Sequence, residues 1–219
     1  MFARMRPFPT YTVMIRHLLT CMLTVFSAFL LGCGAAPIAA DEGPSDVIER
    51  PLPVADRFAY PLGDGQKLTP AKDTKDDWFN ALDFGVDDHL GEDWNKNSGG
   101  NTDCGEPVYA AANGVVSYSG DAGPGWGNVV IVTHSLPDGT RVQTLYGHLR
   151  EIIRADGDIK ISEKIGTIGN ANGKYLCHLH FELRNESSSM WDKAGPGYAA
   201  DRAGWFDPSD FIDQRLGAQ

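Results

Sequence analysis

The chain has 219 residues, of which 42% are hydrophobic, and a formal net charge of −10 at pH 7. This length suits one domain with additional segments and is sufficient for a substantial hydrophobic core. The acidic balance argues against nucleic-acid binding, which requires a basic surface. The 25 Gly and 13 Pro residues indicate many turns rather than long helices.

The N-terminus has the pattern of an export signal. Three arginines precede an apolar run over residues 18–31, which is shorter than a comfortable membrane span. The run leads into Leu-Leu-Gly-Cys33, which resembles the lipobox of bacterial lipoproteins. We predict a signal peptide with lipobox over residues 1–33, lipidation of Cys33 and a membrane-anchored lipoprotein in the periplasm or on the cell surface. The alternative is ordinary cleavage after Ala40 and secretion.

Two cysteines, Cys104 and Cys177, lie beyond the signal segment. Export implies an oxidising compartment, in which an even number of cysteines favours disulfide formation. We therefore predict a disulfide between them, which would tie the loop around Cys104 to the strand that contains His178. The alternative is two buried free thiols.

The rest of the chain divides into a flexible tether over residues 34–57, a domain over 58–212 and a tail over 213–219. Within the domain, short β-forming segments alternate with turn sequences such as Asn-Gly and Asp-Gly, which predicts an all-β, mainly antiparallel single domain. Residues 63–80 should form a loop and 149–154 a brief helix. The aromatic-rich segment after residue 185 would form a wall of a groove or a strap over a sheet edge. The expected strands are 58–62, 108–111, 115–119, 128–134, 143–148, 165–168 and 179–184.

The most specific chemistry lies in residues 176–184, Leu-Cys-His-Leu-His-Phe-Glu-Leu-Arg. Residues two apart in a strand share a face, so His178, His180 and Glu182 would line one side while the apolar residues between them pack the core. Two imidazoles on rigid backbone suit a metal site or an acid–base pair.

A second fragment, His89-Leu-Gly-Glu-Asp93, offers an imidazole and a carboxylate, with Gly91 permitting a tight bend. Together with one histidine of the His-x-His pair it makes a three-ligand set. Such a set leaves the fourth zinc position open, as in catalytic zinc sites. Tyr146-Gly-His148 adds another imidazole at the end of an expected strand.

In this order the motifs resemble the lysostaphin/LytM-type zinc endopeptidases, which cut the peptide cross-links of peptidoglycan. The resemblance covers roughly residues 58–211. It implies a LytM-like duplicated β-motif with a metal-containing groove, in which His89, Asp93 and His180 hold one zinc ion and His148 and His178 form the catalytic pair. The matching segments are His89, Asp93 and residues 105–116, 127–128, 144–148, 166–169 and 178–182. Residues 170–177 replace the family's usual short turn, and residues 75–88 lack a tyrosine that some members use to stabilise the transition state.

Three residues are assigned supporting roles around the metal. Glu182 would orient an imidazole, Tyr146 would lie near the ligands, and His134 would have either a supporting or a purely structural role. Glu92 would point away from its neighbours Asp93 and His89, and we place it on the surface.

The sequence therefore predicts a monomeric, zinc-dependent endopeptidase that acts on peptidoglycan stem peptides or cross-links. The first alternative is a non-enzymatic regulator on the same scaffold that activates a cell-wall amidase, although such relatives typically lack metal ligands. The second is a scaffold lipoprotein whose acidic face binds a partner.

Overall fold

The computed structural model of the chain describes residues 51–65 and 78–216, which lie within the unit formed by residues 48–219. The predicted signal peptide, the lipidation site at Cys33 and most of the predicted tether lie outside these described residues. None of the helices in the described part combines the length and apolarity needed to cross a membrane.

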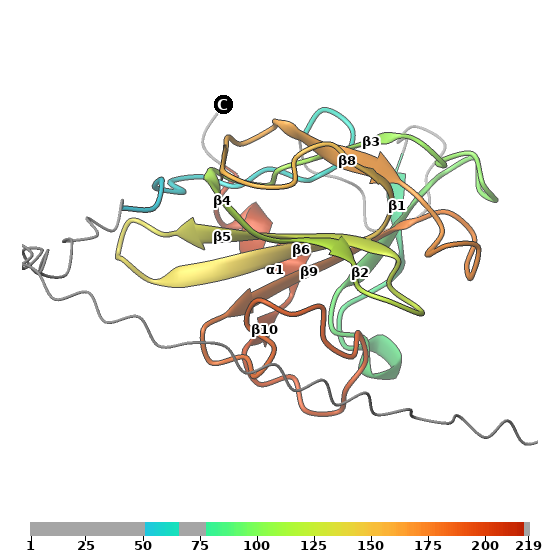
Figure 1. Cartoon of the computed structure of the whole chain (residues 1–219). Coiled ribbons are helices and arrows are strands. Elements are labelled where there is room, and N and C mark those ends of the chain that lie inside the picture. The colour runs from blue at the N-terminus through green and yellow to red at the C-terminus, as the bar shows by residue number, and fades with distance from the viewer. Residues whose placement is uncertain (1–50, 66–77, 217–219) are drawn as a thin grey trace, which may run out of the picture. The chain divides into compact units, whose positions relative to one another are not determined.

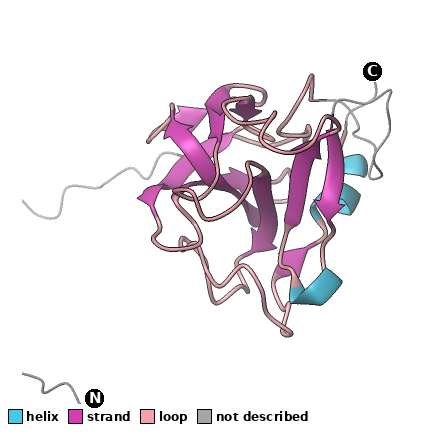
Figure 2. Cartoon of the chain, turned by 90° about the vertical axis from the view of Figure 1, so that its right-hand side faces the viewer, coloured by secondary structure: helices cyan, strands magenta, loops and turns pink. Residues whose placement is uncertain are grey.

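Ten strands form one sheet in the described residues, and each pair of strands is antiparallel, which confirms the predicted all-β fold class (Figure 2). A 3-10 helix, η1 (Val86–Asp88), and a short α-helix, α1 (Pro208–Asp213), complete the regular structure. The strands are β1 (Trp78–Leu82), β2 (Glu92–Lys96), β3 (Pro107–Tyr109), β4 (Gly114–Asp121), β5 (Asn128–Ser135), β6 (Arg141–Ile152), β7 (Asp158–Ile159), β8 (Lys164–Ile168), β9 (Leu179–Asn185) and β10 (Trp205–Phe206).

Two predictions about local structure were wrong. The helix expected over residues 149–154 is absent, because β6 continues to Ile152 and pairs with β8 there. Residues 58–62 form no strand.

Two strands were not expected from the sequence. β1 begins inside the loop expected over residues 63–80, and β2 has the polar sequence Glu-Asp-Trp-Asn-Lys. Pairing with β1 and β9 satisfies the backbone of β2, so tertiary context overrides its weak β-propensity.

The main path of the sheet runs β1-β2-β9-β6-β5-β4-β7. The 12-residue strand β6 is central, because it pairs with β5 and β9 and its last residues also pair with β8. In Figure 1 the β3–β8 pair lies on one side of the long strands, and the connection from β9 to β10 lies on the other.

The two faces of the sheet bury different apolar clusters. The large core lies on the β3–β8 side and includes Trp94, Tyr146 and Phe181. A smaller cluster on the opposite face contains Val129, Ile131 and Leu145, packed against partly buried groups that include Trp126 and Ala194. Because strand residues alternate between faces, the second cluster shares its face with the even-numbered polar residues of β9.

Residues on both sides of the predicted domain, 58–212, contact it. At its N-terminal side, Ala55 donates a backbone hydrogen bond to Ser135, so this part of the predicted tether contacts the sheet. At its C-terminal side, the Arg215 carbonyl accepts a hydrogen bond from Phe58, and the Tyr60 hydroxyl donates to Asp213.

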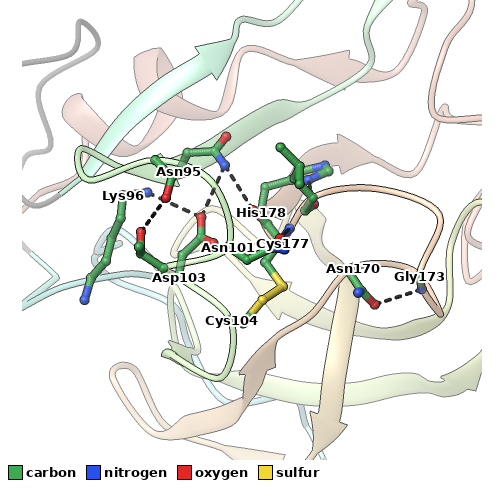
Figure 3. The surroundings of a disulfide bond; sticks show 12 residues. Asn95, Lys96, Asn101, Asp103, Cys104, Asn170, Gly173, Cys177 and His178 are labelled. Carbon is green, nitrogen blue, oxygen red and sulfur yellow. Dashed lines mark hydrogen bonds between the residues drawn. A yellow bond between two sulfur atoms is a disulfide. The ribbon is translucent and has the colours of Figure 1, made fainter.

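A disulfide joins Cys104 and Cys177, whose Cα atoms lie 5.3 Å apart (Figure 3). Asn101 Oδ1 accepts a hydrogen bond from the Cys177 backbone N–H at 2.9 Å, and Asn95 Nδ2 donates to the Cys177 carbonyl at 3.0 Å. The segment before β9 is therefore attached to the loop after β2 by covalent and polar contacts.

Replacing both cysteines with serine should lower the free energy of unfolding by about 4 kcal/mol, because the disulfide spans 73 residues and restricts the unfolded chain. Urea denaturation without reductant measures this loss. Equal stability of the wild-type protein and the double variant, or two free thiols in the unreduced wild type by mass spectrometry, would contradict it.

Candidate metal centre

Three neighbouring strands bring the candidate ligands together. In the β2–β9 pair Asp93 lies opposite His180, and in the β6–β9 pair Gly147 lies opposite the same histidine. A Cβ on Gly147 would lie 3.3 Å from the His180 Cβ and 3.1 Å from the Trp126 ring. Glycine at this position therefore makes room for both side chains on the face that carries the site.

His89 approaches the two strands from the turn formed by η1. Its backbone N–H donates to the Val86 carbonyl, and two residues later Gly91 lies close against the β9 backbone. A Cβ on Gly91 would come within 2.4 Å of the Phe181 carbonyl oxygen. The requirement for glycine here arises from this close packing of backbone, which fixes the distance of His89 from His180.

Three atoms from these residues form a small triangle. His89 Nε2 lies 3.0 Å from His180 Nδ1 and 3.3 Å from Asp93 Oδ1, and His180 Nδ1 lies 2.9 Å from Asp93 Oδ1. The ligand atoms of a tetrahedral zinc site with bonds of roughly 2.0 Å are about 3.3 Å apart. The spacing and the two-nitrogen, one-oxygen donor set therefore fit a small divalent metal ion.

His180 is held in this orientation by a carboxylate on the same face of β9. Its Nε2 lies 3.1 Å from Glu182 Oε1, and Glu182 Oε2 accepts a hydrogen bond from Trp205 Nε1 at 2.9 Å. Burial opposes the charge on His180, but hydrogen bonds to Asp93 and Glu182 outweigh it and raise its pKa to about 9. The second ring nitrogen thus has an anionic partner, which strengthens a ligating imidazole.

Asp93 is ionised in this surrounding. Burial favours its neutral form, but hydrogen bonds with His180 and His89 hold the pKa of Asp93 well below its usual range. Its side chain is 14% exposed, whereas that of His89 is fully buried. The Asp93 carboxylate is therefore an anion that contacts the His89 and His180 imidazoles and remains partly accessible to solvent.

His148 and His178 lie beside this triangle with their ring centroids 4.7 Å apart. His148 Nδ1 is 3.1 Å from the Trp126 carbonyl, and His178 Nδ1 is 2.9 Å from the Leu176 carbonyl. A carbonyl oxygen can only accept, so each Nδ1 carries a proton and donates it to the carbonyl. His178 Nε2 lies 3.7 Å from Asp93 Oδ2.

The backbone at His148 supports the same orientation. This residue has φ 60°, a left-handed conformation that is costly for a non-glycine residue and is often found at functional sites. Its backbone N–H also donates to the Trp126 carbonyl, at 3.1 Å.

Burial lowers the pKa of His148 to about 3, with nearby His180 and His178 adding to the shift. The imidazole is therefore neutral at physiological pH.

A pocket of about 250 Å³ opens over these groups. Two similar segments line it, Pro124-Gly-Trp126 and Pro196-Gly-Tyr198, together with Lys174 and Tyr175. A Cβ on Gly197 would lie 3.3 Å from the Trp126 ring, so the two segments are in close contact. Tyr198 stacks near His89 with ring centroids 4.9 Å apart.

Arg184 anchors the loop that carries the second of these segments, residues 195–198. Its side chain is fully buried, and it donates to the Lys193 carbonyl and to Gln143 Oε1, while Trp126 Nε1 donates to the Gly195 carbonyl. One Arg184 nitrogen also lies 3.7 Å from Glu182. The aromatic-rich segment after residue 185 thus forms a wall of the pocket and, through β10, also pairs with the edge of β9.

Sequence reasoning missed Arg184 and Trp126. The alternation that places His178, His180 and Glu182 on one face also extends to Arg184, and this was the available signal. Trp126 follows a glycine-rich turn, and its role depends on contacts with β6, β9 and the loop around Gly195, which the sequence does not reveal.

His134 and Tyr146 lie away from the triangle. His134 Nδ1 is 2.8 Å from the Asn113 carbonyl and its Nε2 is 2.8 Å from Thr144 Oγ1, while the Tyr146 hydroxyl accepts from the Ala111 N–H at 2.8 Å. Both side chains belong to the core side of the sheet, because they alternate with the residues that face the site. No contact joins them to the candidate ligands within the described part of the chain.

Glu92 corrects one expectation. It does point away from Asp93, but into the interior rather than to the surface, and it is 1% exposed. Trp94 Nε1 and the Ser209 hydroxyl donate to it at 3.0 and 2.9 Å. Burial raises the pKa of Glu92 to about 8. The residue connects β2 with the start of α1.

Comparison of the sequence with known proteins identifies the family to which this chain belongs. The model of peptidase family M23 matches residues 89–191, which include all five residues of the triangle and the histidine pair. Over 87 residues the chain is 34% identical to lipoprotein NlpD of Yersinia enterocolitica, a match that covers 84% of that protein and 39% of this chain. The chain belongs to peptidase family M23.

Other relatives match over shorter parts of their length. The chain is 39% identical over 80 residues to the DD-carboxypeptidase/endopeptidase Mpg of Neisseria meningitidis, which covers 36% of this chain and 17% of that protein. It is 30% identical over 119 residues to the murein hydrolase activator NlpD of Salmonella typhimurium, covering 51% of this chain and 30% of that protein. The catalytic domain of lysostaphin from Staphylococcus simulans aligns over 71% of this chain and 89% of its own, at 19% identity and a TM-score of 0.43.

Replacing Arg184 with methionine should lower the free energy of unfolding by about 3 to 5 kcal/mol, because it removes the buried hydrogen bonds to the Lys193 carbonyl and Gln143 Oε1 and one positive neighbour of the buried Glu182. Urea denaturation measures the change. Arg202→Met is the matched control, since it removes the same charge from an exposed side chain and should cost no more than about 1 kcal/mol. Equal losses in the two variants would contradict the anchoring role.

The buried His134 should make stability depend on pH. Burial lowers its pKa to about 4 from 6.5, so the unfolded chain binds a proton at this residue before the folded chain does. Its contribution is complete above pH 6.5 and is lost as pH falls towards 4, by about 3 kcal/mol. Chemical denaturation from pH 7 to 4 should therefore show a steeper loss for the wild type than for His134→Gln. Parallel curves would contradict this prediction.

Proposed function

We propose that the chain is a zinc-dependent endopeptidase that hydrolyses peptide bonds in peptidoglycan stem peptides or cross-links. The observation that carries this proposal is the convergence of His89 Nε2, Asp93 Oδ1 and His180 Nδ1 at the base of a pocket that two further imidazoles line. The two-histidine, one-carboxylate donor set is of the kind found in catalytic zinc sites.

His89, Asp93 and His180 would hold the ion. Zinc supplies Lewis acidity, which acidifies water and polarises a peptide carbonyl. The three ligand side chains come from a turn and two paired strands, so their positions are set by backbone pairing. Glu182 keeps the His180 ring oriented through its hydrogen bond at 3.1 Å.

His148 and His178 would move the protons of the reaction. One of the two rings would accept the proton of the attacking water at Nε2 as general base. The other, once protonated, donates to the developing oxyanion or to the leaving amine. The contacts of Nδ1 with the Trp126 and Leu176 carbonyls keep both rings in the required tautomer.

The names of the relatives support two readings of the biological role. Mpg is named a DD-carboxypeptidase/endopeptidase, whereas NlpD of Salmonella is named a murein hydrolase activator. A non-enzymatic activator of a cell-wall amidase is therefore the second candidate. Two features favour the enzyme: the complete ligand triangle, and the backbone carbonyls that orient both rings of the histidine pair. An activator requires neither.

The proposed location is the bacterial envelope. The export pattern of residues 1–33 and the lipoprotein NlpD relative support a monomeric lipoprotein anchored through Cys33, in the periplasm or on the cell surface. Metabolic labelling with a lipid precursor, compared between the wild type and Cys33→Ala, distinguishes this from cleavage after Ala40 and secretion.

Two pairs of substitutions should separate metal binding from proton transfer. Asp93→Ala and His180→Ala should lose both zinc and activity, whereas His148→Ala and His178→Ala should keep one zinc per chain and lose at least about 100-fold in rate. Zinc is measured by elemental analysis, and activity by dye release from labelled peptidoglycan. Asp138→Ala, which removes a carboxylate from an exposed loop, serves as the control and should retain both.

Wild-type turnover by His148→Ala would contradict the role given to that residue. A zinc-loaded wild-type protein that releases no dye, but increases the activity of a cell-wall amidase in the same assay, would replace the enzyme with the activator.

A further inference from the structure

The loop before β9 places a cation and a phenol at the edge of the candidate active site. We infer that Lys174 and Tyr175 form a subsite that binds a free carboxylate of the peptide substrate, next to the scissile bond. This inference rests on the proposed peptidase function and adds the chemical class of the substrate group that the pocket recognises.

The polar ends of the two side chains converge on one open space. Lys174 Nζ and Tyr175 Oη each lie 3.6 Å from the position that a Cβ on Gly125 would occupy. Because glycine has no side chain, this space between the loop and residues 124–126 stays open. An ammonium and a phenolic hydroxyl both donate hydrogen bonds, and a carboxylate offers two acceptor oxygens to receive them.

The charge of the surroundings makes this position selective. Lys174 is the only lysine or arginine among the described residues that line the pocket, and no ion pair joins it to a carboxylate of the described chain. The chain as a whole has a net charge of −10, which disfavours the approach of anions in general. The Lys174 ammonium offers it a local attraction.

The subsite adjoins the proposed proton-transfer groups. The Tyr175 ring centroid lies 5.1 Å from that of His148 and 5.8 Å from that of His178. A carboxylate bound by Lys174 and Tyr175 would therefore belong to a residue beside the cleaved bond. Carboxylates are the anionic groups of peptides, which selects this ligand over other anions for a peptidase.

The loop is held in place rather than free to fold over the pocket. The Cys104–Cys177 disulfide fixes its end, and Asn170 organises its turn, accepting from the Gly173 N–H at 2.9 Å through Oδ1 and from the Tyr175 N–H at 3.1 Å through its carbonyl (Figure 3). Within this framework Tyr175 remains 40% exposed. A rigid loop with exposed binding groups lowers the entropy cost of recognition.

The test compares two ligands that differ only in whether their carboxyl groups are free or converted to amides. The probes are a purified cross-linked stem-peptide dimer and the same dimer with its carboxylates converted to carboxamides. Binding is measured by titration calorimetry in the His148→Ala background, which prevents turnover. We expect the carboxylate form to bind about 10-fold more tightly, and Lys174→Gln to abolish this preference.

Two further variants act as controls. Lys174→Arg should retain the preference for the carboxylate form, and Lys160→Gln, which removes the same charge from an exposed lysine that does not line the pocket, should leave it unchanged. Equal affinities for the two dimers, or an undiminished preference in Lys174→Gln, would overturn the subsite.

The same dimers separate the two proposals. Discrimination in binding without cleavage by the zinc-loaded wild-type protein supports the subsite and contradicts the peptidase. Cleavage of both dimers at equal kcat/KM, together with equal affinities, contradicts the subsite and leaves the peptidase in place.

Discussion

The pairing of β9 with β2 on one edge and β6 on the other is the constraint on which the site depends. It places Asp93 and Gly147 on either side of His180. The Asp93 carboxylate approaches the imidazole from β2, and Gly147 on β6 has no side chain and leaves room for the ring. The third donor atom, His89 Nε2, reaches the same point because Gly91 lets the chain pack directly against the β9 backbone. A one-residue slip in this register would turn His180 into the core.

Buried charges on one face of β9 connect the metal centre with the pocket wall. His180 contacts Glu182, Glu182 lies near Arg184, and Arg184 holds the loop that ends in Tyr198 through the Lys193 carbonyl. Isolated charges would be costly in such an interior, whereas each here has an opposite charge or a hydrogen-bond partner nearby. The orientation of a ligand and the shape of the pocket consequently depend on the same row of side chains.

The pocket is built from loops that are tied to one another or to the sheet by different contacts. The disulfide holds the segment before β9, the Trp126 ring packs against the segment around Gly197, and the Trp126 carbonyl holds His148. Trp126 therefore forms part of the wall and also orients the His148 ring. The pocket walls are thus formed by loops, while the candidate ligands Asp93 and His180 lie on paired strands.

The sequence by itself determined the chemistry available to this protein: the alternation of His178, His180 and Glu182, the donor types at His89 and Asp93, and the all-β character set by closely spaced turn signals. Those features depend on near neighbours along the chain, which local periodicity records. Only the tertiary structure decided that Tyr146 and His134 face the core, that Glu92 is buried, that β2 is a strand, and that Arg184 anchors the wall. Each of these depends on which distant strand lies alongside and in what register, and such pairing leaves no signal in a short stretch of residues.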